Sequence, residues 1–290
     1  MHRVRVSLSA IVTAGLLAAP MGAPAEATHL QLSNANFQAR CVYSHAAGDD
    51  PIVFPGQPGA AHLHDFFGST VTDAFSSTQD FRAGATTCDD LKRKEPEDKS
   101  SYWSPAILYH GNAVRPTMID AYYYLQGKHP GNVQPPPMGL RMIAGSSKAT
   151  AAQSIDIVHW QCFTNGTDAT KKFVPIPVCN QTTTSYVTVL LEFPDCWDGM
   201  NLDSADHKSH MAYSGGSPSG GPSCPSTHPV ELPGLRIRYR WKGFQNADGT
   251  ATLSSGGVYS FHGDFWNAWG ESRIKFLVDS CLNVPKDCNP

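Results

Sequence analysis

Cysteine content places the strongest constraint on what this chain can fold into. An even set in an exported protein predicts disulfide bonds rather than a metal cluster, and the absence of a CxxC pair also argues against a redox motif. Because spacing only suggests partners, we expect sequential neighbours to pair. The eight cysteines then form Cys41–Cys88, Cys162–Cys179, Cys196–Cys224 and Cys281–Cys288.

The first residues predict export. Arg3 and Arg5 precede a short apolar stretch at residues 10–19, and Ala25-Glu26-Ala27 has the small-x-small pattern of a signal-peptide cleavage site. We therefore expect residues 1–27 to be a signal peptide and residues 28–290 to form one domain of a secreted, extracellular protein. The apolar stretch is shorter than the roughly 20 residues that cross a bilayer, so we expect no membrane span.

Charge argues against nucleic acid as a partner. Lys and Arg number 22 against 25 Asp and Glu, which gives a formal net charge of -3. The basic run Lys92-Arg93-Lys94 is followed at once by acidic residues. Binding to DNA or RNA rests on clustered Lys and Arg that neutralise phosphates. We expect a monomer that does not bind nucleic acid.

The residue pattern predicts a mainly β fold. Runs rich in Val, Ile, Thr, Tyr and Trp are typical of strands. Between residues 264 and 282 apolar residues recur at helical spacing, which predicts a helix with Asp264 as its N-cap unless that side chain has a functional role. We expect a single antiparallel β-sandwich-like domain with long loops, a C-terminal helix and stabilising disulfides. The expected strands cover residues 101–109, 118–125, 155–162, 185–193 and 235–241.

Histidines supply the candidate functional residues, in three local groups. Imidazole titrates near neutral pH and is the commonest acid–base and metal-binding side chain. Each group also has a structural explanation: a polar strand face, a loop bonded to backbone carbonyls, or the helix N-cap. We expect the groups to meet in one site. They are His62 with His64, which share a face of an extended segment, His207 with His210, and His262 with Asp264.

Motifs in these segments resemble a secreted domain-of-unknown-function family of fungi and actinobacteria. They are DPIVFPG (50–56) followed by HLHDFFG (62–68), CWDG (196–199) running into DHKSHMAY (206–213), and HGDFWNAW (262–269). Ala268 stands where the family pattern has glycine, which leaves His262 and Asp264 in place. The resemblance spans essentially the whole mature chain and implies one secreted domain. It implies no particular reaction, although cell-wall modules on fungal relatives favour contact with polysaccharide.

The function favoured at this point is cleavage of glycosidic bonds in an extracellular or cell-wall polysaccharide, by a hydrolase or lyase without a cofactor. Ordinary glycosidases use two carboxylates, here drawn from Asp198, Asp203, Asp206 and Asp264. The proton-transfer roles fall to His62 or His64 as base and to His207 or His210 as acid, with Asp264 orienting His262.

Two other functions stay open. The same cluster suits a metalloprotein, because imidazole binds both Zn²⁺ and Cu²⁺ and a site of three histidines keeps an open position. The ligand set expected for such an ion is His62, His64 and His207. The third function is a non-catalytic module that binds cell wall or has a structural role.

Overall fold

The computed structural model describes residues 35–89, 96–126, 128, 130–164, 166–168, 171–216 and 222–288. All elements named below belong to one unit, Gln31–Pro290. The expected signal peptide lies outside the described residues. In the part of the chain that is described, no helix is long and apolar enough to cross a membrane.

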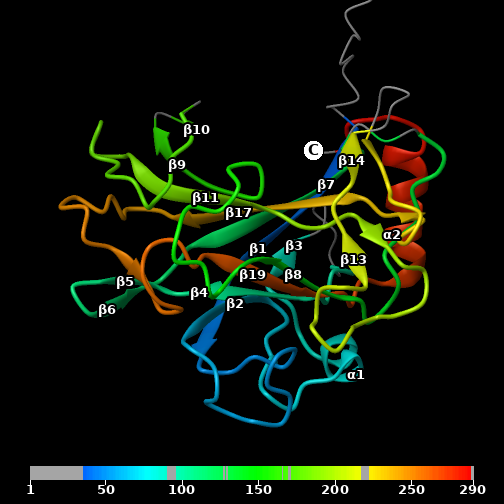
Figure 1. Cartoon of the computed structure of the whole chain (residues 1–290), viewed down its shortest axis with the longest axis horizontal. Helices are drawn as coiled ribbons and strands as arrows, with labels where there is room; N and C mark the ends of the chain where they lie inside the picture. Colours follow the sequence, from blue (N-terminus) through cyan, green and yellow to red (C-terminus); the bar gives the residue numbers. More distant parts are fainter. Residues whose placement is uncertain are drawn as a thin grey trace, which may run out of the picture. The chain divides into compact units, whose positions relative to one another are not determined.

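This unit is built around antiparallel strands, with short helices at its edges (Figure 1). The helical elements are α1 (Thr78–Ala83), α2 (Glu271–Leu277) and a π-helical continuation, η2 (Val278–Leu282). The strands are β1 (Asn36–Ala47), β2 (His64–Gly68), β3 (Cys88–Asp89), β4 (Ser101–Pro105), β5 (Ile107–Tyr109), β6 (Asn112–Val114), β7 (Met118–Tyr124), β8 (Arg141–Gly145), β9 (Val158–Thr164), β10 (Thr167–Asp168), β11 (Tyr186–Glu192), β12 (Cys196–Trp197), β13 (Met211–Ala212), β14 (Gly215–Gly216), β15 (Pro222–Ser223), β16 (Val230–Glu231), β17 (Gly234–Trp241), β18 (Thr252–Leu253) and β19 (His262–Trp266).

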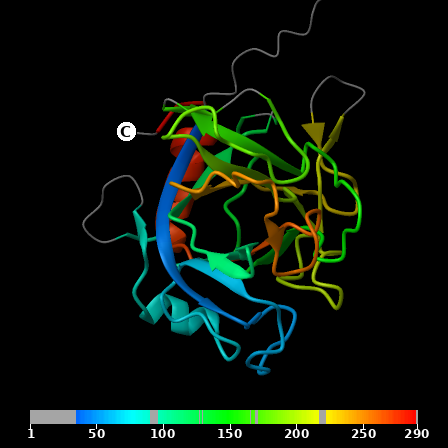
Figure 2. The same ribbon diagram turned by 90° about the vertical axis from the view of Figure 1, so that its left-hand side faces the viewer.

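One long strand joins the two halves of the main sheet. The sheet has the order β10-β9-β11-β17-β7-β1-β2-β4-β19-β8, with β3 paired to β1. The first part of β1 pairs with β7 and its end pairs with β2, and the register shifts between Tyr43 and His45. Such a bulge bends a strand, and β1 curves along one side of the sheet in Figure 2. The curled antiparallel sheet confirms the predicted mainly β, sandwich-like fold.

Aromatic side chains fill the space between the two halves. The ring of Tyr239 on β17 lies 5.8 Å from that of Phe67 on β2 and 5.4 Å from that of Phe261, just before β19. All three side chains are fully buried. A second, smaller cluster that includes Phe66 and Trp103 covers the opposite face of the β2-β4-β19 layer. The layer is therefore buried on both faces.

The C-terminal helix begins later than the sequence predicts. The spacing predicts a helix from residue 264, whereas α2 begins at Glu271 with Gly270 at its N-cap. Residues 262–266 form β19 between β4 and β8, and each of them is buried. Because both faces of this strand are covered, it ends in two successive apolar residues, and Trp266 together with Trp269 beyond the strand imitates helical spacing. Asp264 is thus a strand residue and not an N-cap.

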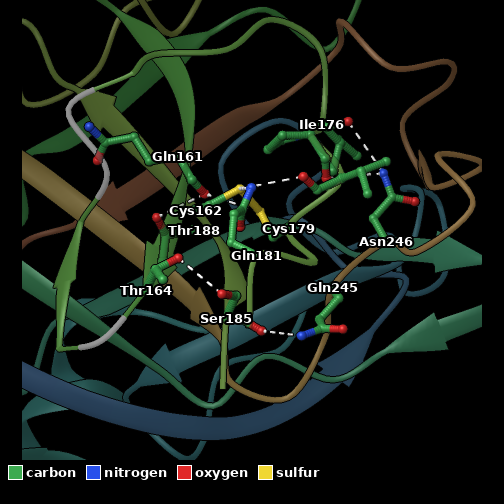
Figure 3. The surroundings of a disulfide bond; sticks show 12 residues. Gln161, Cys162, Thr164, Ile176, Cys179, Gln181, Ser185, Thr188, Gln245 and Asn246 are labelled. Carbon is green, nitrogen blue, oxygen red and sulfur yellow. Dashed lines mark hydrogen bonds between the residues drawn. A yellow bond between two sulfur atoms is a disulfide. The ribbon is translucent and has the colours of Figure 1, made fainter. Parts of the chain in front are cut away.

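All four predicted disulfides are present: Cys41–Cys88, Cys162–Cys179, Cys196–Cys224 and Cys281–Cys288. The second joins β9 to the segment that precedes β11 (Figure 3). Side chains hold the loop beside it: Gln245 donates to the carbonyl of Ser185, and Asn246 donates to the carbonyl of Ile176. The disulfide and these bonds together fix a segment that has little regular structure.

Replacing both Cys162 and Cys179 with serine is expected to lower the free energy of unfolding by about 3 kcal/mol. The bond spans a sequence separation of 17, and closing that loop restricts the unfolded chain. The Cys41–Cys88 bond spans 47 residues, so its loss should cost more, about 4 kcal/mol. Chemical denaturation of the two variants tests this order. A larger loss from the shorter loop would contradict the entropic explanation.

Candidate metal centre

Three histidines meet on one face of the β2-β4-β19 layer. His64 begins β2 opposite Pro105 at the end of β4, and Asp264 on β19 pairs with Trp103, so His262 lies toward the same end of β4. His62, two residues before His64, points to the same face. The ring of His62 lies 4.1 Å from that of His64 and 5.0 Å from that of His262. Ligand atoms of all three lie within 4.8 Å of one another.

Backbone hydrogen bonds determine which ring nitrogen carries the proton in two of these histidines. Nδ1 of His64 lies 2.9 Å from the carbonyl oxygen of Asp49, and Nδ1 of His262 lies 2.8 Å from that of Ser260. A carbonyl oxygen only accepts, so each Nδ1 donates and each Nε2 keeps its lone pair. Metal-ligating histidines are oriented in this way. Nε2 of His64 and Nε2 of His62 are buried and have no hydrogen-bond partner among the described residues.

Burial keeps the three imidazoles neutral. It lowers the pKa of His62, and it lowers the pKa of His262 to about 3. The pKa of His64 lies well below its usual range because the side chain is buried and because charge on the other two histidines would repel its own. Neutral imidazole is the form that binds metal. At neutral pH the three side chains therefore offer lone pairs without first losing a proton.

Two buried carboxyl groups adjoin the imidazoles. Asp264 follows His262 by two residues on β19, is 1% exposed, and has no described hydrogen-bond partner for either carboxyl oxygen. Asp50 is 4% exposed, and its Oδ1 accepts from two backbone N–H groups at 3.0 Å. Ligand atoms of Asp50, Asp264 and His64 also lie within 4.8 Å of one another. His64 therefore belongs to two overlapping sets of possible ligands.

Burial raises the pKa of both carboxyl groups. Burial raises the pKa of Asp264 well above its usual range, and the charge of Asp50 raises it further, whereas Lys208 lowers it. Burial also raises the pKa of Asp50, against the effect of its backbone hydrogen bonds. Lys208 donates from Nζ to the carbonyl oxygen of Gly145 at 2.6 Å. Because Gly145 pairs with His262, this ammonium group lies at the β8 edge of the cluster.

A cavity of about 250 Å³ opens at the same edge. Lys208 and Gly145 line it, together with Gln153, Tyr213 and the apolar side chain of Ile143. Ile143 pairs with Asp264 across β8 and β19. The cavity therefore borders the β8 residues that pair with His262 and Asp264, and it contains both polar and apolar surface.

One protein-family model matches a stretch of the chain that includes the three histidines and both buried aspartates. A family described as a domain of unknown function, DUF1996, matches residues 50–269. The chain belongs to this family. The DUF1996 match begins at Asp50 and extends beyond Asp264, so it includes both sets of possible ligands. No curated protein and no solved structure matches the chain.

The second histidine group of this DUF1996 chain makes other contacts. His210 is buried, with Nδ1 at 2.9 Å from Oγ of Ser204 and Nε2 at 2.7 Å from the carbonyl oxygen of Arg141. His207 has a positive φ of 56°, and its Nδ1 lies 2.9 Å from Oδ1 of Asp203. Both ring nitrogens of His210 are therefore engaged, whereas His207 stands beside a carboxylate.

The residues that meet in the DUF1996 site thus differ from those that the sequence led us to expect. His62 and His64 meet His262, and not the expected third ligand His207. The carbonyl oxygen of Ser260, rather than Asp264, bonds Nδ1 of His262. Of the expected carboxylates, Asp198, Asp203 and Asp206 accept hydrogen bonds from neighbouring loop residues.

Sequence reasoning assigned no role to Asp50 or Lys208 in this DUF1996 chain. Asp50 begins the motif DPIVFPG, whose proline and glycine indicate only a turn. Lys208 lies between His207 and Ser209 in a polar loop. The one available signal was their position inside motifs shared with the family. Neither residue has a spacing that relates it to His64 or Asp264.

Gly263 separates His262 from Asp264 and faces the core. A Cβ at this position would lie 2.5 Å from Cδ2 of Leu191 and 2.6 Å from the hydroxyl of Tyr239. Gly263→Ala is therefore expected to displace β19 and to destabilise the protein by about 1–3 kcal/mol. Gly215→Ala, where a Cβ meets nothing within 4 Å, is the matched control. Equal melting temperatures of the two variants would contradict this expectation, because they would show that β19 accommodates the added methyl group without loss of stability.

Proposed function

We propose that the protein is a secreted metalloprotein in which His62, His64 and His262 bind one zinc or copper ion. The observation that carries this proposal is the convergence of three imidazoles, two of them held through Nδ1 by backbone carbonyls. A buried acceptor without a donor costs about 1–3 kcal/mol. One metal ion accepts all three lone pairs and removes that cost for Nε2 of His62 and His64.

Secretion is part of the same proposal. Four disulfides persist in an oxidising compartment, and the described chain contains no membrane-spanning helix. Both observations are compatible with an extracellular protein. On this proposal residues 1–27 are removed as a signal peptide and residues 28–290 remain as the mature domain.

Hydrolysis is the chemistry that the surroundings of the three histidines suit best. A zinc ion on three histidines keeps one position open and, when bound, lowers the pKa of a water there. Asp264 has two acceptor oxygens free among the described residues and a ligand atom within 4.8 Å of that of His64. If the ion is bound, Asp264 would serve as the carboxyl group that exchanges a proton with that water. The cavity lined by Lys208 and Tyr213 is the adjoining space for a substrate.

The metal proposal has a direct test. Wild-type protein is expected to contain about one equivalent of zinc or copper, to lose it to a chelator, and to melt at a lower temperature afterwards. Free metal at 100 times Kd should restore about 2.7 kcal/mol of stability. His228→Ala, a change at a surface loop, should behave like wild type. Folded protein that neither contains metal nor gains stability from added zinc or copper would contradict the proposal.

The carboxyl groups support a second candidate, acid–base cleavage of an extracellular or cell-wall polysaccharide without a metal. Carboxyl oxygens of Asp50 and Asp264 lie within 4.8 Å of each other, and retaining glycosidases hold two carboxyl groups about 5–5.5 Å apart. Burial that favours the protonated form of Asp264 suits a general acid. Polysaccharide cleavage by chelator-treated wild type, lost in Asp264→Asn, would favour this candidate over the metal centre.

A further inference from the structure

One ion on three histidines leaves part of this cluster unexplained. It satisfies Nε2 of His62 and His64, whereas a water on that ion would engage at most one of the two oxygens of Asp264. Those two oxygens belong to a side chain that is 1% exposed, and no described residue donates to them. Asp50, also buried, brings a second carboxyl group within 4.8 Å. Two such groups side by side call for a cation or for shared protons.

We infer that Asp50 and Asp264 form a second cation-binding position beside the histidine centre, which makes the site dinuclear. The inference rests on the proposed function, because the two positions adjoin at His64. A ring nitrogen of His64 lies within 4.8 Å of the ligand atoms of the other residues in each set. Its single lone pair serves one ion, so the second position depends on oxygen atoms.

The oxygen donors are already oriented for this role. Oδ1 of Asp50 accepts two backbone N–H groups at 3.0 Å, which fixes the plane of the carboxyl group and leaves Oδ2 for an ion. Hydrogen bonds of this kind commonly support ligating carboxylates. Asp264 lies in the middle of β19, paired with Trp103 on one side and Ile143 on the other. A side chain on a doubly paired strand has little freedom to turn away.

Charge also favours a divalent ion at this position. When ionised, the two carboxyl groups carry two negative charges, and Lys208, an ammonium group that acts on Asp264, donates at 2.6 Å to the carbonyl of Gly145. A divalent cation between the carboxylates compensates both charges at the shortest distance.

The two positions should select different metals. Three imidazoles favour zinc or copper, whereas carboxylate and water oxygens favour manganese, magnesium or calcium. Adjacent ions suit hydrolysis, since one holds the attacking water and the other stabilises the leaving oxygen.

The test uses copper as a paramagnetic probe in the histidine centre. Protein loaded with one equivalent of Cu²⁺ is titrated with Mn²⁺ and followed by electron paramagnetic resonance. We expect one equivalent of Mn²⁺ to bind and to broaden or abolish the copper signal, because ions a few ångströms apart couple. Asp50→Asn and Asp264→Asn should keep the copper but bind Mn²⁺ at least 10-fold more weakly. Asp156→Asn, at a side chain 86% exposed, is the control.

Each outcome separates the two proposals. Copper bound at one equivalent, with no Mn²⁺ binding or no change in its signal, would overturn the second position and leave the histidine centre standing. Mn²⁺ binding that is unchanged in folded Asp50→Asn and Asp264→Asn would overturn it as well. Failure of folded wild type to bind copper would instead overturn the histidine centre, and the dinuclear site with it.

Discussion

The double variant His62→Ala/His64→Ala is expected to bind zinc at least about 100-fold more weakly than wild type. Loss of an outer hydrogen bond to a ligand already costs 10–100-fold in affinity, and this variant loses two of three proposed ligands. Only His262 and the neighbouring carboxyl groups would remain. Competition titration with a chromophoric chelator measures the affinity of both proteins.

Folding of this variant should be preserved in the absence of metal. The substitutions lose no hydrogen bond through Nε2, and the one described hydrogen bond that they remove is that from Nδ1 of His64 to the carbonyl of Asp49. His210→Ala is the matched control, because it removes a buried histidine whose ring nitrogens contact Ser204 and Arg141. It should lose stability and keep its zinc. Unchanged zinc affinity in His62→Ala/His64→Ala would place the ion elsewhere.

The second large effect is expected far from the histidines. Lys128→Met should lower the free energy of unfolding by about 3–5 kcal/mol, because it breaks a buried ion pair and leaves one charge behind. Nζ of Lys128 lies 2.5 Å from Oδ2 of Asp195, and both side chains are fully buried. The same ammonium group donates to the carbonyl of Leu232 at 2.6 Å. The substitution therefore leaves the carboxylate of Asp195 without its countercharge, held by two hydrogen bonds from Ser214, and removes a donor from the carbonyl of Leu232.

Chemical denaturation of Lys128→Met and of an exposed counterpart measures this cost. Lys275 and Asp279 form an ion pair on α2 and η2 with side chains 66% and 47% exposed. Lys275→Met should cost less than about 1 kcal/mol, as exposed pairs do. Similar losses in both variants would show that the Lys128–Asp195 pair is solvated in solution.

Local patterns were sufficient to predict the class of fold and the disulfides. The alternation in residues 235–241 corresponds to β17, whose side chains alternate between buried and half-buried. It is visible in sequence because one face of that strand meets solvent. β19 gives no such signal, since all its residues are buried. A short run buried on both sides has no period that distinguishes a strand from a helix.

The site could be predicted only in part, for a related reason. His62 and His64 are two residues apart, so a local rule places them on one face. Their meeting with His262 depends on the registers of β2 and β19 on β4, which bring both strands to the same end of β4. That register depends on contacts between segments nearly 200 residues apart in the sequence. It therefore cannot be recognised from the local spacing of residues. The same holds for Asp50, which reaches Asp264 only through the folded loop.

The most direct measurement of the central claim is anomalous X-ray scattering at the zinc edge from crystals of the zinc-loaded protein. We predict an anomalous peak with Nε2 of His62, His64 and His262 each at about 2.0–2.1 Å. Zinc bound instead at His207 or at surface histidines, with nothing among these three imidazoles, would contradict the account.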